Sequence, residues 1–360
     1  MNKKDDVMLK LPKLLLSMFT LGSLMANGAA QADESVVTLK LAHFLPAHSV
    51  TQAQFLEPWA QRITQQSNGR IQFQFYPSMQ LGGTPPQLVD QVRDGVADIV
   101  WTLPGYSSGR FPLTAAFELP FMSSSSEASS QAMWDFIQKH GQDEFADMHL
   151  LATHLTDGAL VHTTKKPIHT LKDFRGQKLR AANRTAAKTI GLLGATPVAM
   201  PVPQVPEALS KGVVDGAVLP WDVVPALKLH ELVKYHTETA AGTPALMHTA
   251  LIVGMNKDTY NKLPADLKQV IDANSGRELS REAGRIWDNQ VVETGHKLAQ
   301  SRNNEIYVLP PEEQTKWMET TSQVSEDWIK DVESKGYENG KALLDEARQL
   351  IEQYNAKLPR

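Results

Sequence analysis

A strand–helix–strand–helix–strand pattern occurs twice in this chain and restricts its fold more than any other feature. Its strands alternate apolar and polar residues or are short apolar runs, and its helices have apolar residues three or four apart before a glycine. The first copy spans 36–46, 51–70, 71–77, 82–95 and 96–104, and the second spans 176–182, 183–194, 196–201, 205–212 and 213–220. This alternation predicts an α/β protein whose sheets are covered by helices.

The two copies also share local sequence. "VRDGVADIVWTLP" in the first copy resembles "LSKGVVDGAVLP" in the second, with Gly95 matching Gly212 and Asp98 matching Asp215. A helix–glycine–strand join can look alike in unrelated proteins, but a repeat of the whole pattern favours two similar lobes.

The rest of the chain divides between these lobes. The stretch 245–264 predicts a strand that crosses back between them, and three long helical stretches follow it, with a strand at "EIYVLP" after the first. We assign 33–157 and about 246–300 to lobe I. We assign 158–245 and about 301–360 to lobe II and the C-terminal helices.

The N-terminal segment has the layout of a secretory signal peptide. Four lysines precede the apolar run Leu14–Ala26, and Ala30-Gln31-Ala32 forms an A-x-A cleavage site, which predicts a cut after Ala32 and a periplasmic location. An uncleaved anchor is the alternative, but the run is shorter than the ~20 residues of a spanning helix. The chain has no cysteine, which excludes disulfides and a cysteine-linked lipid. Its formal net charge of −4 argues against nucleic-acid binding.

Arg180 ends an otherwise apolar predicted strand. In open α/β sheets, ligands bind beyond the carboxyl ends of the strands. A guanidinium keeps its charge and matches a carboxylate with two parallel hydrogen bonds. Arg180 therefore either binds a ligand carboxylate or pairs with an Asp or Glu of the protein.

Several motifs together resemble one family. "DFRGQKLRAAN", "LLGATPVAMP", "ALSKGVVDGA" and the early "LAHFLPAHS" are similar to the extracytoplasmic solute-binding subunits of TRAP transporters, the DctP type, in order along essentially the whole chain after the leader. The resemblance implies a two-lobed periplasmic binding protein fold with a mixed sheet in each lobe and a ligand cleft between them. It also implies uptake of an organic acid, which Arg180 holds by its carboxylate with help from Asn183.

The resemblance implies partners as well. A receptor of this kind is a monomer that delivers its ligand to a small and a large membrane subunit driven by an ion gradient. It is not an enzyme, and no cofactor, metal or catalytic residue is expected.

The chain differs from the family members that bind highly polar acids at the positions where those members carry polar ligand-binding side chains. Leu103 and Leu219 stand where such members carry polar side chains, and Trp101, Tyr106 and Trp221 lie nearby. Apolar walls would leave the hydroxyl groups of a sugar acid without hydrogen-bond partners. Each buried, unpaired group costs ~1–3 kcal/mol of binding free energy. We therefore expect a monocarboxylate with a largely apolar remainder: an aromatic, branched or short 2-oxo or 2-hydroxy acid. The same aromatics could instead pack the core or the hinge.

Residues near the first strand complete the predicted site. His43 and His48 flank the loop after that strand and could donate to the ligand or cap a helix, and Phe44 could form a wall of the cleft. Members of the family carry a second, auxiliary arginine, and this chain has His162 near that position instead. A ligand with a second carboxylate is therefore less favoured.

Two other functions stay open at this point. A receptor of similar shape could serve another transporter type, such as an ATP-driven one. A periplasmic enzyme on the same scaffold would need a nucleophile or an acid–base pair. The "GYSSG" stretch (Gly105–Gly109) fits G-x-S-x-G, but the sequence after it begins no helix, as a nucleophile elbow requires.

Overall fold

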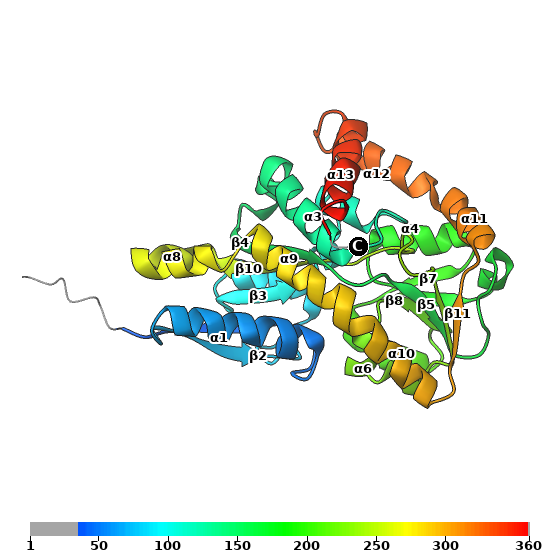
Figure 1. Ribbon diagram of the computed structural model, residues 1–360, viewed down its shortest axis with the longest axis horizontal. Helices are drawn as coiled ribbons and strands as arrows, with labels where there is room; N and C mark the ends of the chain where they lie inside the picture. The colour runs from blue at the N-terminus through cyan, green and yellow to red at the C-terminus, as the bar shows by residue number, and fades with distance from the viewer. Residues whose placement is uncertain (1–34, 359–360) are drawn as a thin grey trace, which may run out of the picture. The chain divides into compact units, whose positions relative to one another are not determined.

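The strands form two mixed sheets in a computed structural model that describes residues 35–358 (Figure 1). The predicted signal peptide and its cleavage point lie outside these residues. The first sheet, the centre of lobe I, has the order β2-β1-β3-β10-β4. Its strands are β1 (Val37–Ala42), β2 (Ile71–Tyr76), β3 (Ile99–Thr102), β4 (Met148–Leu155) and β10 (Ala250–Asn256).

The second sheet, the centre of lobe II, has the order β11-β9-β5-β8-β6-β7. Its strands are β5 (Leu160–Thr163), β6 (Lys178–Ala181), β7 (Thr196–Ala199), β8 (Gly216–Leu219), β9 (Tyr235–Glu238) and β11 (Glu305–Val308). In each sheet three parallel strands from one copy of the repeated pattern are followed by an antiparallel strand, β10 or β5, that arrives from the other lobe. The predicted repeat and two-lobed fold are therefore confirmed.

The matched glycines and aspartates have the same roles in both lobes. Gly95 and Gly212 have φ of 73° and 68°, a left-handed conformation that glycine adopts without steric cost where a helix ends. Asp98 Oδ2 accepts a hydrogen bond from the backbone N–H of Lys40, and Asp215 Oδ2 accepts one from the N–H of Lys178, both at 2.8 Å. Each carboxylate thus ties its helix–strand turn to the neighbouring parallel strand.

Helices cover the sheets and extend beyond them. In the first half they are η1 (Thr51–Leu56), α1 (Glu57–Gln66), α2 (Leu88–Arg93), α3 (Ser126–His140), α4 (Arg184–Leu193), α5 (Val205–Ser210) and α6 (Val223–Ala226). In the second half they are α7 (Lys257–Lys262), α8 (Ala265–Ala273), α9 (Arg277–Ile286), η9 (Trp287–Val291), α10 (Val292–Ser301), α11 (Pro311–Thr321), α12 (Gln323–Ser334) and α13 (Gly340–Asn355). Short 3₁₀ turns include η3 (Pro104–Tyr106), η4 (Thr114–Glu118) and η7 (Val202–Gln204). Between residues 35 and 358, no helix is both long and apolar enough to cross a membrane.

Three connections run between the strands of the two sheets. The segments between β4 and β5 and between β9 and β10 run side by side, because His248 Nδ1 lies 2.8 Å from the Thr156 carbonyl oxygen and Thr156 N–H donates to the Thr249 carbonyl. The third connection is the continuous run α9–η9–α10, which packs on α3 and β4 at one end and on α6 and β11 at the other (Figure 1). Its middle turn carries Asp288, whose carboxylate accepts from the N–H groups of Ser126 and Glu127 at the start of α3.

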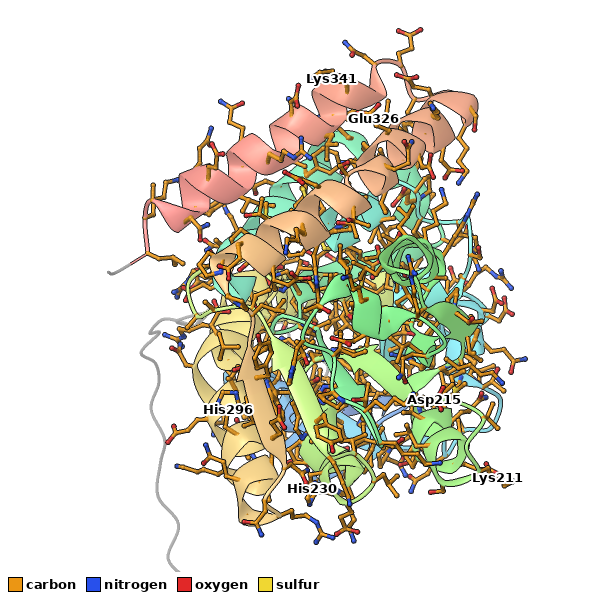
Figure 2. All side chains as sticks on the ribbon, turned by 90° about the vertical axis from the view of Figure 1, so that its right-hand side faces the viewer. Lys211, Asp215, His230, His296, Glu326 and Lys341 are labelled. Carbon is orange, nitrogen blue, oxygen red and sulfur yellow. The ribbon has the colours of Figure 1, made fainter. Side chains whose placement is uncertain are left out.

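The C-terminal helices bridge back to lobe I. α11 packs on α4 of lobe II, and α13 packs on α3 and α12. Glu326 and Lys341 mark α12 and α13 at the end opposite to His230 and His296 (Figure 2). The exact bounds of the two lobes stay a prediction.

Candidate ligand-binding site

Arg180 lies in the interior of the second sheet, near the carboxyl end of β6 between β7 and β8. The residue is only 2% exposed. Nε donates to the Met200 carbonyl oxygen at 3.0 Å, and Nη1 donates to the Val218 carbonyl oxygen at 3.3 Å. Among the described residues, no Asp or Glu carboxylate forms an ion pair with it, so the pairing alternative is not what the structure shows.

The burial of Arg180 is costly without an anion. Desolvation holds the pKa of its guanidinium below the usual value, although the nearby Tyr106 hydroxyl acts in the opposite direction. A buried charge that has only neutral partners keeps most of its desolvation cost, and a carboxylate can offset it. The arrangement therefore favours an anionic ligand.

A cavity lies beside this guanidinium and is lined by residues from both lobes. Phe44 packs on Trp101 and Tyr106, with ring centroids 4.9 and 5.7 Å apart, so one wall is aromatic. Leu103 and Leu219 add aliphatic surface. Six of the predicted ligand residues thus line this one cavity: Phe44, Trp101, Leu103, Tyr106, Arg180 and Leu219.

Tyr106 also connects the lobes. Its hydroxyl accepts a hydrogen bond from the backbone N–H of Val202 in η7, at 2.9 Å. Burial raises the pKa of this phenol, so it stays neutral. This hydrogen bond holds the aromatic wall of lobe I, to which Tyr106 belongs, against lobe II beside Arg180.

Four predicted ligand residues do not line the Arg180 cavity. Trp221 stacks on His236 at 4.8 Å between centroids, and its Nε1 donates to Glu238. His43 is buried and contacts Gln52 Oε1 at 2.8 Å; desolvation lowers its pKa to about 4 and keeps it neutral. His48 Nε2 lies 3.2 Å from the Ala226 carbonyl oxygen of lobe II.

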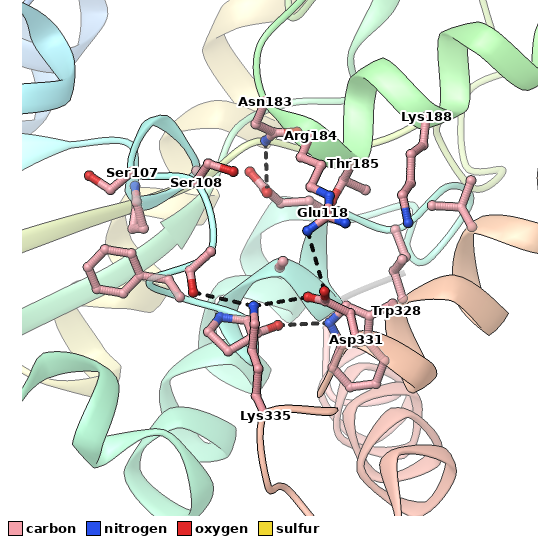
Figure 3. Close-up of a pocket in the computed structure, with 18 residues that line it drawn as sticks. Ser107, Ser108, Glu118, Asn183, Arg184, Thr185, Lys188, Trp328, Asp331 and Lys335 are labelled. Atoms are coloured by element: carbon pink, nitrogen blue, oxygen red, sulfur yellow. Dashed lines mark hydrogen bonds and ion pairs between the residues drawn. The ribbon is translucent and has the colours of Figure 1, made fainter. Parts of the chain in front are cut away.

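Asn183 is the fourth of these residues. Its Oδ1 accepts from the Ala186 N–H and caps α4, while its Nδ2 donates to Glu118 Oε2 at 2.8 Å (Figure 3). It lines a separate groove together with the Gly105–Gly109 loop and α12. An asparagine before a helix is a strong N-cap, and that role takes its oxygen away from any ligand.

His162 does not supply a second cation. Its Nδ1 lies 2.7 Å from His236 Nδ1, and its Nε2 lies 3.2 Å from the Leu219 carbonyl oxygen. Burial and the neighbouring histidine hold its pKa well below the usual range. Among the described residues that line the cavity, Arg180 is therefore the one basic side chain.

The prediction missed three polar residues of the cavity: Thr156, Thr249 and Asp222. The threonines come from the two adjacent crossing segments, whose pairing could not be read from the sequence. Asp222 follows the carboxyl end of β8, the same kind of position that drew attention to Arg180. Burial raises the pKa of Asp222 to about 6.

Comparison with known proteins identifies the family. The family model for bacterial extracellular solute-binding protein, family 7 (DctP), matches residues 41–331. A TRAP solute-binding protein from Rhodoferax ferrireducens, solved with copurified benzoate, is 42% identical with a TM-score of 0.88, covering 89% of this chain and 99% of that one.

Two further solved structures are similar. A marine metagenome TRAP protein specific for aromatic acid ligands, solved with 3-hydroxybenzoate, is 42% identical with a TM-score of 0.87, covering 89% of this chain and 99% of its own. A protein from Bordetella bronchiseptica with bound mandelate is 30% identical with a TM-score of 0.81, covering 88% and 99%.

Proposed function

Because the chain belongs to the DctP family, family 7 of the bacterial extracellular solute-binding proteins, we propose that its Arg180 cavity captures an organic monocarboxylate. The chain is a TRAP-type solute receptor, and members of its family are periplasmic or extracytoplasmic. Its acid has a largely apolar remainder: aromatic, branched, or a short 2-oxo or 2-hydroxy acid. Delivery to the two membrane subunits, a monomeric state and leader cleavage near Ala32 belong to the same proposal.

The observation that carries the proposal is a buried arginine without a protein carboxylate. The planar fork of Arg180 can donate two parallel hydrogen bonds to a ligand carboxylate. In a cavity that excludes water, the low dielectric strengthens this ion pair. The mechanism is capture: the lobes close on the acid, and the receptor performs no chemistry on it.

The walls support the apolar part of the proposal. Phe44, Trp101, Leu103 and Leu219 offer no partners to a polyhydroxylated chain except the Trp101 indole N–H, which already bonds His154 Nε2 at 2.8 Å. The benzoate, 3-hydroxybenzoate and mandelate found in the similar receptors are aromatic monoacids of this kind.

Thermal unfolding against a panel of acids tests the proposal. A ligand at ~100 times its Kd adds ~2.7 kcal/mol, which raises the Tm by ~2–4 °C or somewhat less in a chain of this size. We expect such a shift with benzoate or mandelate in the wild type and none in Arg180→Ala.

Arg184→Ala is the matched control. Arg184 lies four residues away, with its side chain 59% exposed and paired with Asp331, so its loss should leave the ligand shift intact. A shift with polyhydroxy acids alone would contradict the apolar ligand. A full benzoate or mandelate shift retained in Arg180→Ala would contradict the carboxylate anchor.

A further inference from the structure

The phenol oxygen of Tyr106 lies where the two lobes meet in the wall of the Arg180 cavity. Tyr106 belongs to η3, which follows β3 of the first sheet, whereas Arg180 lies on β6 of the second sheet. The oxygen accepts from the Val202 backbone N–H at 2.9 Å. It also interacts with the Arg180 guanidinium, where burial lowers the pKa and the phenol opposes that effect. All three residues line the cavity, so the phenol and the guanidinium are neighbours in its wall.

The hydroxyl proton of Tyr106 has no acceptor within residues 35–358. A phenol can both accept and donate, and here its oxygen is seen only as an acceptor. The carboxyl oxygens of the neighbouring Glu118 accept instead from Ala250 and Asn183. Burial holds the pKa of the phenol above its usual value, so the proton stays in place at neutral pH. In a receptor without ligand only water can accept this proton, and an acceptor on the ligand can replace that water.

Arg180 has donors to spare beside this phenol. Its Nε and Nη1 donate to the carbonyl oxygens of Met200 and Val218, and a guanidinium carries more N–H groups than these two contacts use. A carboxylate that binds the remaining N–H groups comes to lie next to the phenol that interacts with the same guanidinium. A hydrogen bond from a neutral O–H to a carboxylate is charge-assisted and stronger than one between neutral groups.

We propose that Tyr106 donates its hydroxyl proton to the carboxylate of the bound acid, as a second anchor from the lobe opposite to Arg180. This inference rests on the proposed function and adds a residue that positions the carboxylate. The acid is then held from both lobes at one group. Opening the lobes would separate Tyr106 from Arg180, so the bond belongs to the closed form alone. A ligand favours one conformation through such a difference in contacts.

Infrared difference spectroscopy with a carboxyl-labelled acid tests this bond. The probe is ¹³C-carboxyl benzoate or mandelate, or the panel acid with the largest Tm shift if neither of these binds. The label separates the carboxylate band of the ligand from the bands of the protein. In Tyr106→Phe this band should leave its wild-type position, because the carboxylate loses a donor. Calorimetric titration should show binding that is weaker by roughly 10–100-fold.

The substitution keeps the ring of Tyr106 that packs on Phe44, but it also removes the bond to Val202 between the lobes. Asn183→Ser is the matched control for that second effect. Asn183 Nδ2 donates to Glu118 across the lobes, and neither residue lines the Arg180 cavity. Its loss should weaken binding while the labelled band stays at its wild-type position.

The outcomes separate the two proposals. A wild-type band position or a wild-type affinity in Tyr106→Phe would overturn the role of Tyr106 and leave the monocarboxylate receptor standing. The same displacement of the band in Asn183→Ser would also overturn it, because contact between the lobes would then set the band. If no acid of the panel binds the wild type, the proposed function fails as well.

Discussion

Glu118 is a buried carboxyl group that holds the two lobes together outside the Arg180 cavity. Its Oε1 accepts from the Ala250 N–H in β10 at 3.1 Å, and its Oε2 accepts from Asn183 Nδ2 of lobe II at 2.8 Å. Burial raises its pKa from 4.5 to about 8, against the effect of these two donors. The carboxyl is therefore mostly protonated at neutral pH.

This shift predicts a pH dependence of stability. Between pH 4.5 and about 8 the folded chain keeps a proton on Glu118 that the unfolded chain has released. The free energy of unfolding should therefore fall as the pH rises through this window, by at most about 1.4 kcal/mol per pH unit from this group. Glu118→Gln removes that contribution. Urea unfolding at pH 5 and pH 8 should show that the variant loses less stability than the wild type.

The comparison with a variant is needed because buried histidines act in the opposite direction. Desolvation lowers the pKa of His154 to about 3, so this residue makes the fold less stable as the pH falls below 6.5. Its effect is common to the wild type and to Glu118→Gln. The exposed Glu293→Gln serves as a control and should keep nearly the wild-type slope. Identical slopes for the wild type and Glu118→Gln would refute the raised pKa.

The site residues show what a sequence can and cannot reveal. The positions of Arg180, Leu103 and Leu219 in the cavity wall could be predicted, because strand ends face the cleft. Leucine also stood out at two positions where related receptors carry polar residues. The capping role of Asn183 and the burial of His43 depend on neighbours that the sequence does not place. Asp222 stood at an equally informative strand end, but its burial beside Asp157 appears only in three dimensions.

Among the helices, α3 and α9 approach each other closely at a glycine (Figure 1). A Cβ on Gly284 would lie 2.4 Å from the Ser126 carbonyl oxygen, so alanine there must push two backbones apart. We expect Gly284→Ala to lower the free energy of unfolding by ~1–3 kcal/mol.

Gly191 in α4 is the matched control, because a Cβ there meets nothing within 4 Å. Gly191→Ala should raise stability by ~0.5–1 kcal/mol, since alanine loses less backbone entropy in a helix. Guanidinium unfolding of both variants measures the difference. Similar effects of the two substitutions would contradict the close approach of α3 and α9.

The elements themselves were largely predictable. The strands of both repeated patterns, the crossing strand β10 and the helical C-terminal part agree with the sequence analysis. β4 and β9 were not foreseen, because "MHLLATHL" and "YHTE" place histidines inside strands. Their His154 and His236 are fully buried and neutral, a state that depends on packing.

For the molecule as a whole, closure depends on hydrogen bonds between the lobes. Asn183→Ser keeps an N-cap for α4 but is too short to reach Glu118. Since the lost bond stabilises the closed form, we expect a bound acid to dissociate about tenfold faster, with little change in the association rate. Stopped-flow displacement of the acid measures both rates. Arg184→Ala should dissociate like the wild type, and an unchanged rate in Asn183→Ser would show that this bond does not hold the lobes closed.

The missing carboxylate beside Arg180 has a practical consequence for anyone who purifies the protein. A buried guanidinium with only neutral partners in the protein favours the retention of a small acid from the growth medium, so we expect preparations to arrive already loaded. Affinities measured on them would report exchange with a resident molecule. Because the chain has no cysteine, it can be unfolded in denaturant, dialysed and refolded without disulfide reshuffling. Mass spectrometry of the dialysate would then name the resident acid.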